Sequence, residues 1–526
     1  MLRLRRIFPR LSLTAPIRNA ADQNCRFVAG AAIVSIFSVV VSGCAVGPNF
    51  APPPAPDVER YTRERLSSPD AGPGAPYVKG QHFVSGANIS SRWWTAFHSR
   101  PLNELIKLSV EHNPSLQAAE SAIRIAQFNA LAQRGVFFPQ IGANYTPSIQ
   151  QTSSDTNTGP SPPSAFSLHT AQLNVSFVPD IWGQNIRAVE SLDAISEQQM
   201  FQMEAAYLTL TANVVTAAIQ EASLRGQIAA VQRIVKLERG ILDILKSQFN
   251  AGQASQVDVL AQEATLAQSE QLLPPLEKQL AIQRDLLTAL AGQFSADEIL
   301  QKFDLNHLEL PANLPVSLPS TLVRQRPDVR AAEAILHSAS ALVGVSIAAR
   351  LPNITISGNA GSSAFKFAEL VTPGTSFYLL AASATQPIFD GFTLYHKQKA
   401  AEAALDQADA LYRQAVVTAL QNVADALRSL QADIRSVKAA VKAELAAKAS
   451  LDIIQKQLSL GQVNQVVVLN AQQIYLTAAV VRVQSQATRL ADTAALFMAL
   501  GGSWPSNCAS SDWRQCVFES TDVAER

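Results

Sequence analysis

Cysteine is missing from the whole central part of this chain. The 526 residues include 4 cysteines, which are Cys25 and Cys44 near the N-terminus and Cys508 and Cys516 near the C-terminus. A long chain without thiols in its core suits an oxidising compartment. For the same reason we predict a short-loop disulfide between Cys508 and Cys516, with two free thiols as the alternative.

Charge is also scarce. Charged residues make up 16% of the chain, and Lys+Arg and Asp+Glu number 42 each, so the formal net charge is zero. Without a basic field the protein is not expected to bind nucleic acid. A hydrophobic share of only 48% also excludes a polytopic helical membrane protein.

Motifs for catalysis are absent as well. The sequence contains no G-x-x-x-x-G-K-[ST], H-E-x-x-H or G-x-S-x-G pattern, and its 7 histidines are scattered without metal-ligand spacing. We therefore expect no enzyme activity, no metal site and no cofactor. Any transport that needs energy must then obtain it from a partner protein.

The N-terminal region has the order of a secretory signal peptide. Arginines are concentrated in residues 1–26, residues 27–41 are almost wholly apolar, and small residues lead into Cys44. We predict a signal peptide over residues 1–43 and lipid attachment at Cys44, with an ordinary cleavage site or an uncleaved anchor helix as alternatives. Acyl chains would hold Cys44 on a membrane, because each buried CH₂ contributes about 0.8 kcal/mol.

The chain that follows is internally duplicated. Residues 252–261 and 461–470 share the pattern G-Q-x-x-Q-V-x-V-L, roughly 210 residues apart. A second repeated stretch occurs in the same order along the chain: N-P-S-L-Q-A-A-E at 113–120 is similar to R-P-D-V-R-A-A-E at 326–333. Each G-Q pattern lies between two long runs rich in Leu, Ala and Gln. This arrangement predicts the tip of a helical hairpin, with Gly252 and Gly461 at positions of positive φ.

Long helices are predicted on both sides of each tip. A helix over residues 391–459 would be about 100 Å long, and the return helices are expected over about 255–291 and 464–499, with a break at Pro274-Pro275. Apolar residues in the two long helices follow a heptad spacing: Leu224, Ile228, Val231 and Val235 in the first, and Val416, Leu420, Val423, Leu427, Leu430, Ile434, Val437 and Val441 in the second.

Two β-hairpins precede the long helices. Alternating residues predict strands in a first hairpin over about 140–178 and in a second over about 353–388, with a loop at 361–375. Each strand has about ten residues, the length of a tilted transmembrane strand. Four strands cannot close a barrel, and lipid does not tolerate an open edge, whereas three copies of the chain would supply twelve strands around a lumen.

The sequence therefore predicts a mixed α and β fold, assembled as a trimeric 12-stranded β-barrel continuous with an α-helical barrel. Arg92 to Phe97 opens the ordered region, and the pair Trp93-Trp94 is interpreted as a buried anchor. The predicted order of segments is the signal peptide at 1–43, an extended or belt segment at 44–100, the first repeat at 101–293, a linker or belt at 294–325, the second repeat at 326–500 and a tail at 501–526.

The mature chain resembles the outer-membrane channel component of tripartite efflux pumps, in the lipoprotein subgroup of the outer membrane efflux protein family. The matching residues are Cys44 with G-P-N-F at 47–50, Trp93-Trp94, L-P-S at 318–320, R-P-D-V-R-A-A-E at 326–333, 461–469, and L-G-G-S-W at 500–504. The resemblance implies a homotrimer in the outer membrane with a large periplasmic part. It also implies docking to a periplasmic adaptor protein and an inner-membrane pump, and export of small molecules or drugs.

The same resemblance implies which residues act at the helical tips. An apolar pore ring falls on Val466, and an acidic ring falls on Asn470, where this sequence departs from the family because asparagine carries no charge. Asp258 could supply a compensating charge, or it could cap its helix.

Gly252, Gln253, Gly461 and Gln462 are the expected adaptor-docking residues. Two other functions stay open, namely the exit duct of a type I protein secretion system and a purely structural coiled-coil lipoprotein.

Overall fold

The structure, a computed structural model, describes residues 45–58, 60–64, 68, 80–87, 89–151, 165–502 and 513. The described residues have a mixed α and β fold in which helices predominate, and they fall into two compact units. The first, here the sheet unit, holds residues 45–47, Val136–Arg187 and Gly344–Tyr395. The second, the helical unit, holds the rest. Cys44, Cys508 and Cys516 lie outside the described residues, so the lipid site and the disulfide stay predictions.

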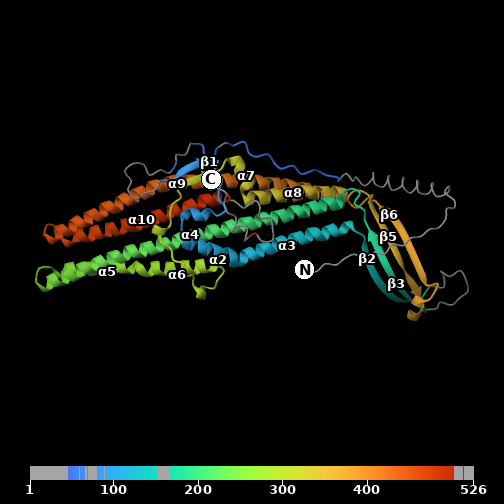
Figure 1. The fold of residues 1–526 in the computed structure, drawn as a ribbon, viewed down its shortest axis with the longest axis horizontal. Helices are drawn as coiled ribbons and strands as arrows, with labels where there is room; N and C mark the ends of the chain where they lie inside the picture. The colour runs from blue at the N-terminus through green and yellow to red at the C-terminus, as the bar shows by residue number, and fades with distance from the viewer. Residues whose placement is uncertain are drawn as a thin grey trace, which may run out of the picture. The chain divides into compact units, whose positions relative to one another are not determined.

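The sheet unit is built on four antiparallel strands, which lie where alternation predicts them. Their order is β2-β3-β5-β6, so the two predicted hairpins pair through β3 and β5 (Figure 1). The bounds are β2 Gln140–Gln151, β3 Ala165–Phe177, β5 Asn353–Ala364 and β6 Ser376–Thr385.

The expected loop at 361–375 is too long, because β5 continues to Ala364. Gly361 permits this continuation, since a Cβ at this position would clash with the carbonyl oxygen of Ala171 on β3.

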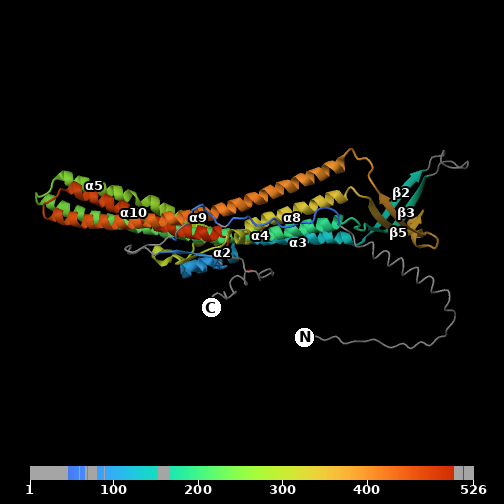
Figure 2. The same cartoon turned by 90° about the horizontal axis from the view of Figure 1, so that it is seen from above.

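The helical unit contains two long hairpins, α4 with α5 and α9 with α10, whose tips lie at the same end (Figures 1 and 2). The predicted break at Pro274-Pro275 is confirmed, because α5 ends at Gln271 and α6 begins at Leu273. By length and composition α8 and α10 are apolar enough to cross a membrane, a property they share with core helices of soluble proteins. The helices are α2 Arg100–His112, α3 Pro114–Arg134, α4 Gln184–Asn250, α5 Gln256–Gln271, α6 Leu273–Leu290, α7 Pro319–Gln325, α8 Pro327–Ala348, α9 Thr393–Ser459 and α10 Gln465–Ala499.

The heptad seams are the buried faces of the long helices. On α9, Val423 and Leu430 are fully buried, and Leu420 is half-buried. The other five of the eight apolar seam residues are at most 8% exposed. On α4, Val231 and Val235 are buried in the same way. The predicted seams are therefore confirmed as packing surfaces, which explains why such long helices are stable within one chain.

A hydrophobic core joins the helices of the helical unit to its connecting segments. Trp93 and Trp94 are 2% and 1% exposed, and Trp93 stacks on Phe497 of α10 with ring centroids 5.4 Å apart, which confirms the Trp pair as a buried anchor. Next to it, β1 (His82–Ser85) pairs in parallel with β4 (Asn313–Val316). This pairing joins the N-terminal segment to the connection between the two repeats.

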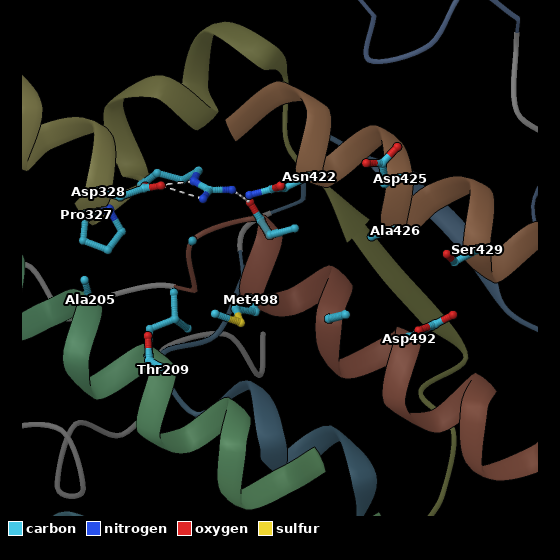
Figure 3. Close-up of a pocket in the computed structure, with 15 residues that line it drawn as sticks. Ala205, Thr209, Pro327, Asp328, Asn422, Asp425, Ala426, Ser429, Asp492 and Met498 are labelled. Atoms are coloured by element: carbon cyan, nitrogen blue, oxygen red, sulfur yellow. Dashed lines mark hydrogen bonds and ion pairs between the residues drawn. The ribbon is translucent and has the colours of Figure 1, made fainter. Parts of the chain in front are cut away.

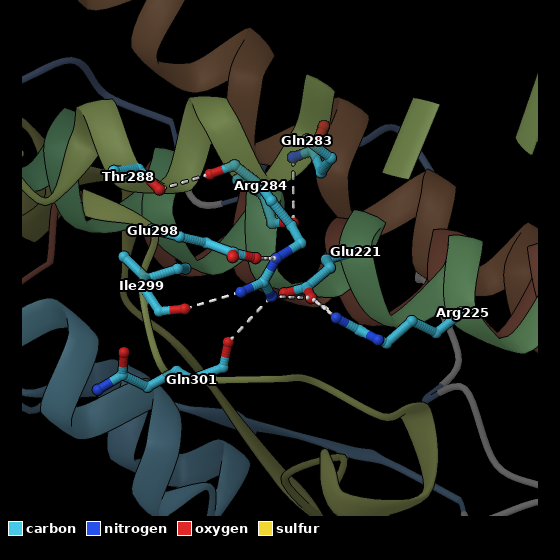
Figure 4. A network of polar contacts seen from close by, with 9 residues as sticks. Glu221, Arg225, Gln283, Arg284, Thr288, Glu298, Ile299 and Gln301 are labelled. Atoms are coloured by element: carbon cyan, nitrogen blue, oxygen red, sulfur yellow. Dashed lines mark hydrogen bonds and ion pairs between the residues drawn. The ribbon is translucent and has the colours of Figure 1, made fainter. Parts of the chain in front are cut away.

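A buried arginine holds that connection against α4 (Figure 4). Arg284 of α6 donates to Glu221 of α4 at 2.8 Å, to Glu298 at 2.6 Å, and to the carbonyl oxygens of Ile299 and Gln301 at 2.7 and 3.2 Å. Burial lowers the pKa of Arg284, but the hydrogen bonds to Glu298 and Glu221 outweigh it and raise the pKa above its ordinary value. The guanidinium therefore stays charged and fixes the start of the connection.

Candidate functional site: the helical tips

Both tips end their long helix with the same backbone geometry. Gly252 has φ +74° and Gly461 has φ +71°. The amide of each glycine donates to the carbonyl three residues earlier, at 2.9 Å, and the amides of Gln253 and Gln462 donate to the carbonyl five residues earlier, at 2.8 and 2.9 Å. This pair of hydrogen bonds defines a Schellman motif, which requires a residue in the left-handed backbone conformation. A Cβ would meet nothing within 4 Å at either glycine, so conformation and not space demands glycine there.

The return helices begin with different caps. Ser255 accepts from the backbone amide of Asp258 at 3.2 Å, and the Asp258 carboxylate accepts from the Ser255 amide at 3.3 Å, which is a capping box. In the second tip Asn464 accepts from the amide of Val467 at 3.3 Å. The capping interpretation of Asp258 is therefore confirmed, while a charge ring at Asp258 stays a prediction.

The residues expected at the pore are exposed in the single chain. Val466 is 66% exposed and its counterpart in the first repeat, Val257, is 73% exposed. Asn470 is exposed one turn further along α10, on the same face as Val466. Gln253 and Gln462 are exposed as well. The structure thus leaves Val466, Asn470, Gln253 and Gln462 accessible for contacts with other chains, whereas Asp258 is half-buried in its capping box.

A buried polar contact between the hairpins was not predicted from the sequence. Gln465 of α10 donates to Gln262 of α5 at 2.8 Å, and Gln262 donates to the carbonyl of Glu238 on α4 at 3.3 Å. Gln465 is 4% exposed, Gln262 is fully buried and Glu238 is 1% exposed. Burial raises the pKa of Glu238 to about 7. The motif glutamine of the first repeat, Gln256, is exposed instead, so the two copies use the same residue differently.

A second polar cluster ties α9 and α10 to the N-terminal segment. Arg489 of α10 is 1% exposed and donates to Gln81 at 3.1 Å, while Gln81 donates to Thr493 at 3.3 Å. Burial lowers the pKa of Arg489 to about 10. Burial and the nearby carboxylate of Asp492 raise the pKa of Asp433 on α9. These groups make a fixed internal network away from the tips.

A cavity of about 410 Å³ lies where α8 begins and α10 ends (Figure 3). Arg326 closes one side, with bonds of 2.9 and 2.7 Å to Asp328 and of 2.6 Å to the carbonyl oxygen of Ala499. Asp425 of α9 and Asp492 of α10 line the opposite side. Within the described ranges no group of three His, Cys, Asp or Glu residues could hold a metal ion. The cavity therefore offers a polar wall and a structural ion pair.

Comparison with known proteins agrees with this architecture. The family model described as outer membrane efflux protein matches residues 105–293 and 318–502, so both repeats are covered. The pyoverdine export outer membrane protein OpmQ of Pseudomonas putida is 26% identical over 420 residues, which span 79% of this chain and 89% of the relative. The probable efflux pump outer membrane protein TtgC of Pseudomonas putida is 24% identical over 480 residues, 90% of this chain and 95% of the relative.

The crystal structure of the Campylobacter jejuni CmeC outer membrane channel is similar in fold. It matches with a TM-score of 0.80 and 21% identity, over 92% of this chain and 100% of that one. The family match covers well over half of the sequence, and the resemblance seen in the sequence is confirmed. The chain belongs to the outer membrane efflux protein family.

Proposed function

We propose that this chain is the outer-membrane exit duct of a tripartite efflux system of the kind driven by a resistance-nodulation-division pump, and that it conducts small molecules passively. The observation that carries this function is the match of the efflux family to both repeats. Its family and fold are those of channel proteins, so transport and not catalysis is its activity. Energy comes from the inner-membrane pump, which a periplasmic adaptor links to the duct.

Three copies of the chain form the duct. In the described sheet, β2 and β6 are the edge strands, and an edge exposed to lipid would leave backbone groups without hydrogen bonds. Pairing β6 of one copy with β2 of the next closes the sheet, and three copies give a twelve-stranded barrel wide enough for a lumen. The long hairpins of the three copies then form the periplasmic helical barrel.

The tips are the periplasmic gate and the adaptor-docking surface. Val466 and Asn470 share an exposed face of α10, which suits two successive rings around a pore. Gln253 lines a surface groove along the end of α4 with Asp243, Ile244, Ser247, Gln248 and Ala251, where an adaptor helix could dock. Because Asn470 is neutral, this constriction attracts cations less than a carboxylate ring would.

Cys44 anchors the duct to the outer membrane through acyl chains. The support is its position directly after the apolar run and small residues of the predicted signal. Replacing Cys44→Ser should abolish incorporation of a labelled fatty acid while leaving the amount of protein in the membrane fraction measurable. Undiminished labelling would show that another residue carries the acyl groups.

Conductance and efflux measurements test the function. Purified protein should form ion-conducting pores in planar bilayers, and the Asn470→Asp variant should become more cation-selective. In cells that express a matching adaptor and pump, loss of the chain should raise accumulation of a fluorescent pump substrate. The alternative, a type I secretion duct, would be favoured by two results together: the pores carry no small molecules, and cells that lack the chain no longer export an unfolded protein. A chain that gives no conductance would be structural.

A further inference from the structure

The four strands of the sheet have one apolar face and one polar face. Cross-strand register places the two sets: Ile141, Ala143, Tyr145, Leu173, Val175, Ile356, Ala360 and Leu380 on one face, and Asn144, Thr146, Thr170, Gln172, Asn174, Ser357, Asn359 and Ser363 on the other. Phe166, Leu168, Phe377 and Leu379 also lie on the second face, but amides and hydroxyls are the more numerous side chains there. In a barrel that crosses a membrane the first face contacts lipid and the second contacts water.

Neither face carries a charge. None of the residues of β2, β3, β5 and β6 is Lys, Arg, Asp or Glu. Charged residues appear only outside the strands, such as Arg350 before β5 and the ion pair of Lys366 with Glu369 after it, at 3.2 Å. His169, on the apolar face, is hydrogen-bonded to the Tyr145 hydroxyl at 2.8 Å. The polar face is hydrophilic through neutral groups alone.

Carboxamides on the polar face are linked across the strands. Gln172 donates to Asn174 at 2.7 Å, Asn174 donates to Asn144 on β2 at 3.2 Å, and Asn144 donates to the Thr146 hydroxyl at 3.1 Å. Asn359 on β5 is the register partner of Asn174, so the row extends over a third strand. Each bond in the row uses one N–H of a carboxamide, which has a second N–H and a further carbonyl lone pair to offer.

We propose that Asn144, Gln172, Asn174 and Asn359 form a charge-neutral selectivity band in the wall of the channel, which passes ions of both signs alike and contacts polar solutes through hydrogen bonds. This inference rests on the proposed function, because the polar face is a channel wall only if the sheet closes in a membrane. The band suits uncharged or zwitterionic solutes that are rich in amide and hydroxyl groups, since a carboxamide both donates and accepts.

The absence of charge from the band has a measurable effect on the local concentrations of cations and anions. A single carboxylate about 8 Å away, roughly the separation of diagonal neighbours on paired strands, raises the local concentration of a cation and lowers that of an anion by roughly 2.4-fold each in water. Their ratio therefore changes roughly five-fold, and more where the wall excludes water. A band without such groups should therefore leave the reactivity of cationic and anionic reagents nearly equal. A band with one added carboxylate per chain should separate them by roughly five-fold or more.

The experiment uses cysteine reporters on the two faces of β3. Thr170→Cys lies on the polar face and leaves all four carboxamides intact, and the adjacent Ala171→Cys is its control on the apolar face. Both are made in the full chain with Cys508→Ser and Cys516→Ser, and intact cells are treated with cationic and anionic methanethiosulfonates. Rates are divided by those of a small thiol in solution, after subtraction of the background without a reporter.

We expect the Thr170→Cys reporter to react with both reagents at normalised rates within about two-fold, and the Ala171→Cys reporter to react at least ten-fold more slowly. Adding Asn144→Asp should raise the cation-to-anion ratio at the Thr170→Cys reporter roughly five-fold. A cation-to-anion rate ratio above five-fold without the added carboxylate, or an unchanged ratio with it, would refute the charge-neutral band but not the channel function. If neither reporter reacts and the protein gives no conductance in planar bilayers, both the band and the proposed channel function are refuted.

Hydrogen bonding is tested by protection of the same reporter. A neutral capped tetraglycine amide, which donates and accepts, should slow labelling of the Thr170→Cys reporter at least two-fold more than the dimethyl ether of an ethylene glycol oligomer of similar mass, which only accepts. Replacing Asn144→Leu and Asn174→Leu together should remove the difference. Equal protection by both probes in the unmodified band would refute the hydrogen-bonding role.

Discussion

Replacing Arg284→Met tests how strongly the connection between the repeats is held. Arg284 is buried, and its partner Glu221 is fully buried, so their ion pair is poorly screened by solvent. Loss of one partner from a buried pair costs about 3–5 kcal/mol. Glu221 keeps its bonds to Arg225 at 2.7 and 2.8 Å, so we expect the lower end of that range. The carbonyls of Ile299 and Gln301 also lose their donor.

Hydrogen exchange of the backbone amides at 298–304 measures this effect locally. A loss of about 3 kcal/mol in opening free energy corresponds to exchange roughly a hundred-fold faster, since 1.4 kcal/mol is a factor of about ten. Amides in the middle of α9 serve as an internal reference, because Arg284 does not contact that helix in any of its hydrogen bonds.

Glu298→Gln is the matched control from the same cluster. The Glu298 side chain is 65% exposed, so its ion pair with Arg284 is screened by water and contributes only about 0–1 kcal/mol. Exchange in this variant should rise less than about five-fold. If Arg284→Met accelerates exchange no more than Glu298→Gln does, the buried ion pair does not hold the connection and the reasoning is wrong.

Two further predictions concern the tips. Gly461→Ala should destabilise its hairpin by about 1 kcal/mol, because the φ of Gly461 is +71°. Its control, Gly240→Ala, lies inside α4 with open space for a Cβ and should stabilise the protein by about 0.5–1 kcal/mol. Melting temperatures that shift in the same direction for both variants would contradict this reasoning. Glu238 has a pKa raised to about 7, so the folded state binds its proton more tightly than the unfolded state. Local stability at the hairpin should then be highest below about pH 4.5 and fall by about 2–3 kcal/mol as pH rises through 7. Glu238→Gln should flatten that dependence in hydrogen exchange corrected for intrinsic rates, and an unchanged slope would exclude Glu238 as its cause.

Much of the fold follows from patterns that are local along the chain. The heptad seams of α4 and α9, the break before Leu273, the alternating strands and the Gly-Gln tips each depend on residues within a few turns of one another. Such patterns repeat many times, so a single sequence suffices to find them. The duplication strengthened the predictions of the strands, the long helices and the tips, because each of these was seen twice.

The sequence could not show which side chains from distant segments meet. Gln256 and Gln465 occupy the same place in the repeated motif, yet only Gln465 is buried, because its partner Gln262 belongs to the other hairpin. Arg284 carried no signal either, since a lone arginine in a helix is usually solvated. Its burial depends on how residues 298–301 return across α4.

The sequence by itself determined the duplication, the two kinds of hairpin and the family, because periodicity and motif spacing are properties of the chain. Only the tertiary structure decided that Asn144, Asn174 and Asn359 form one row, because strand register joins positions far apart in sequence. A shift of one residue would have moved each of these side chains to the opposite face. The physical reason is that hydrophobic alternation specifies a face, whereas cross-strand hydrogen bonding specifies neighbours on that face.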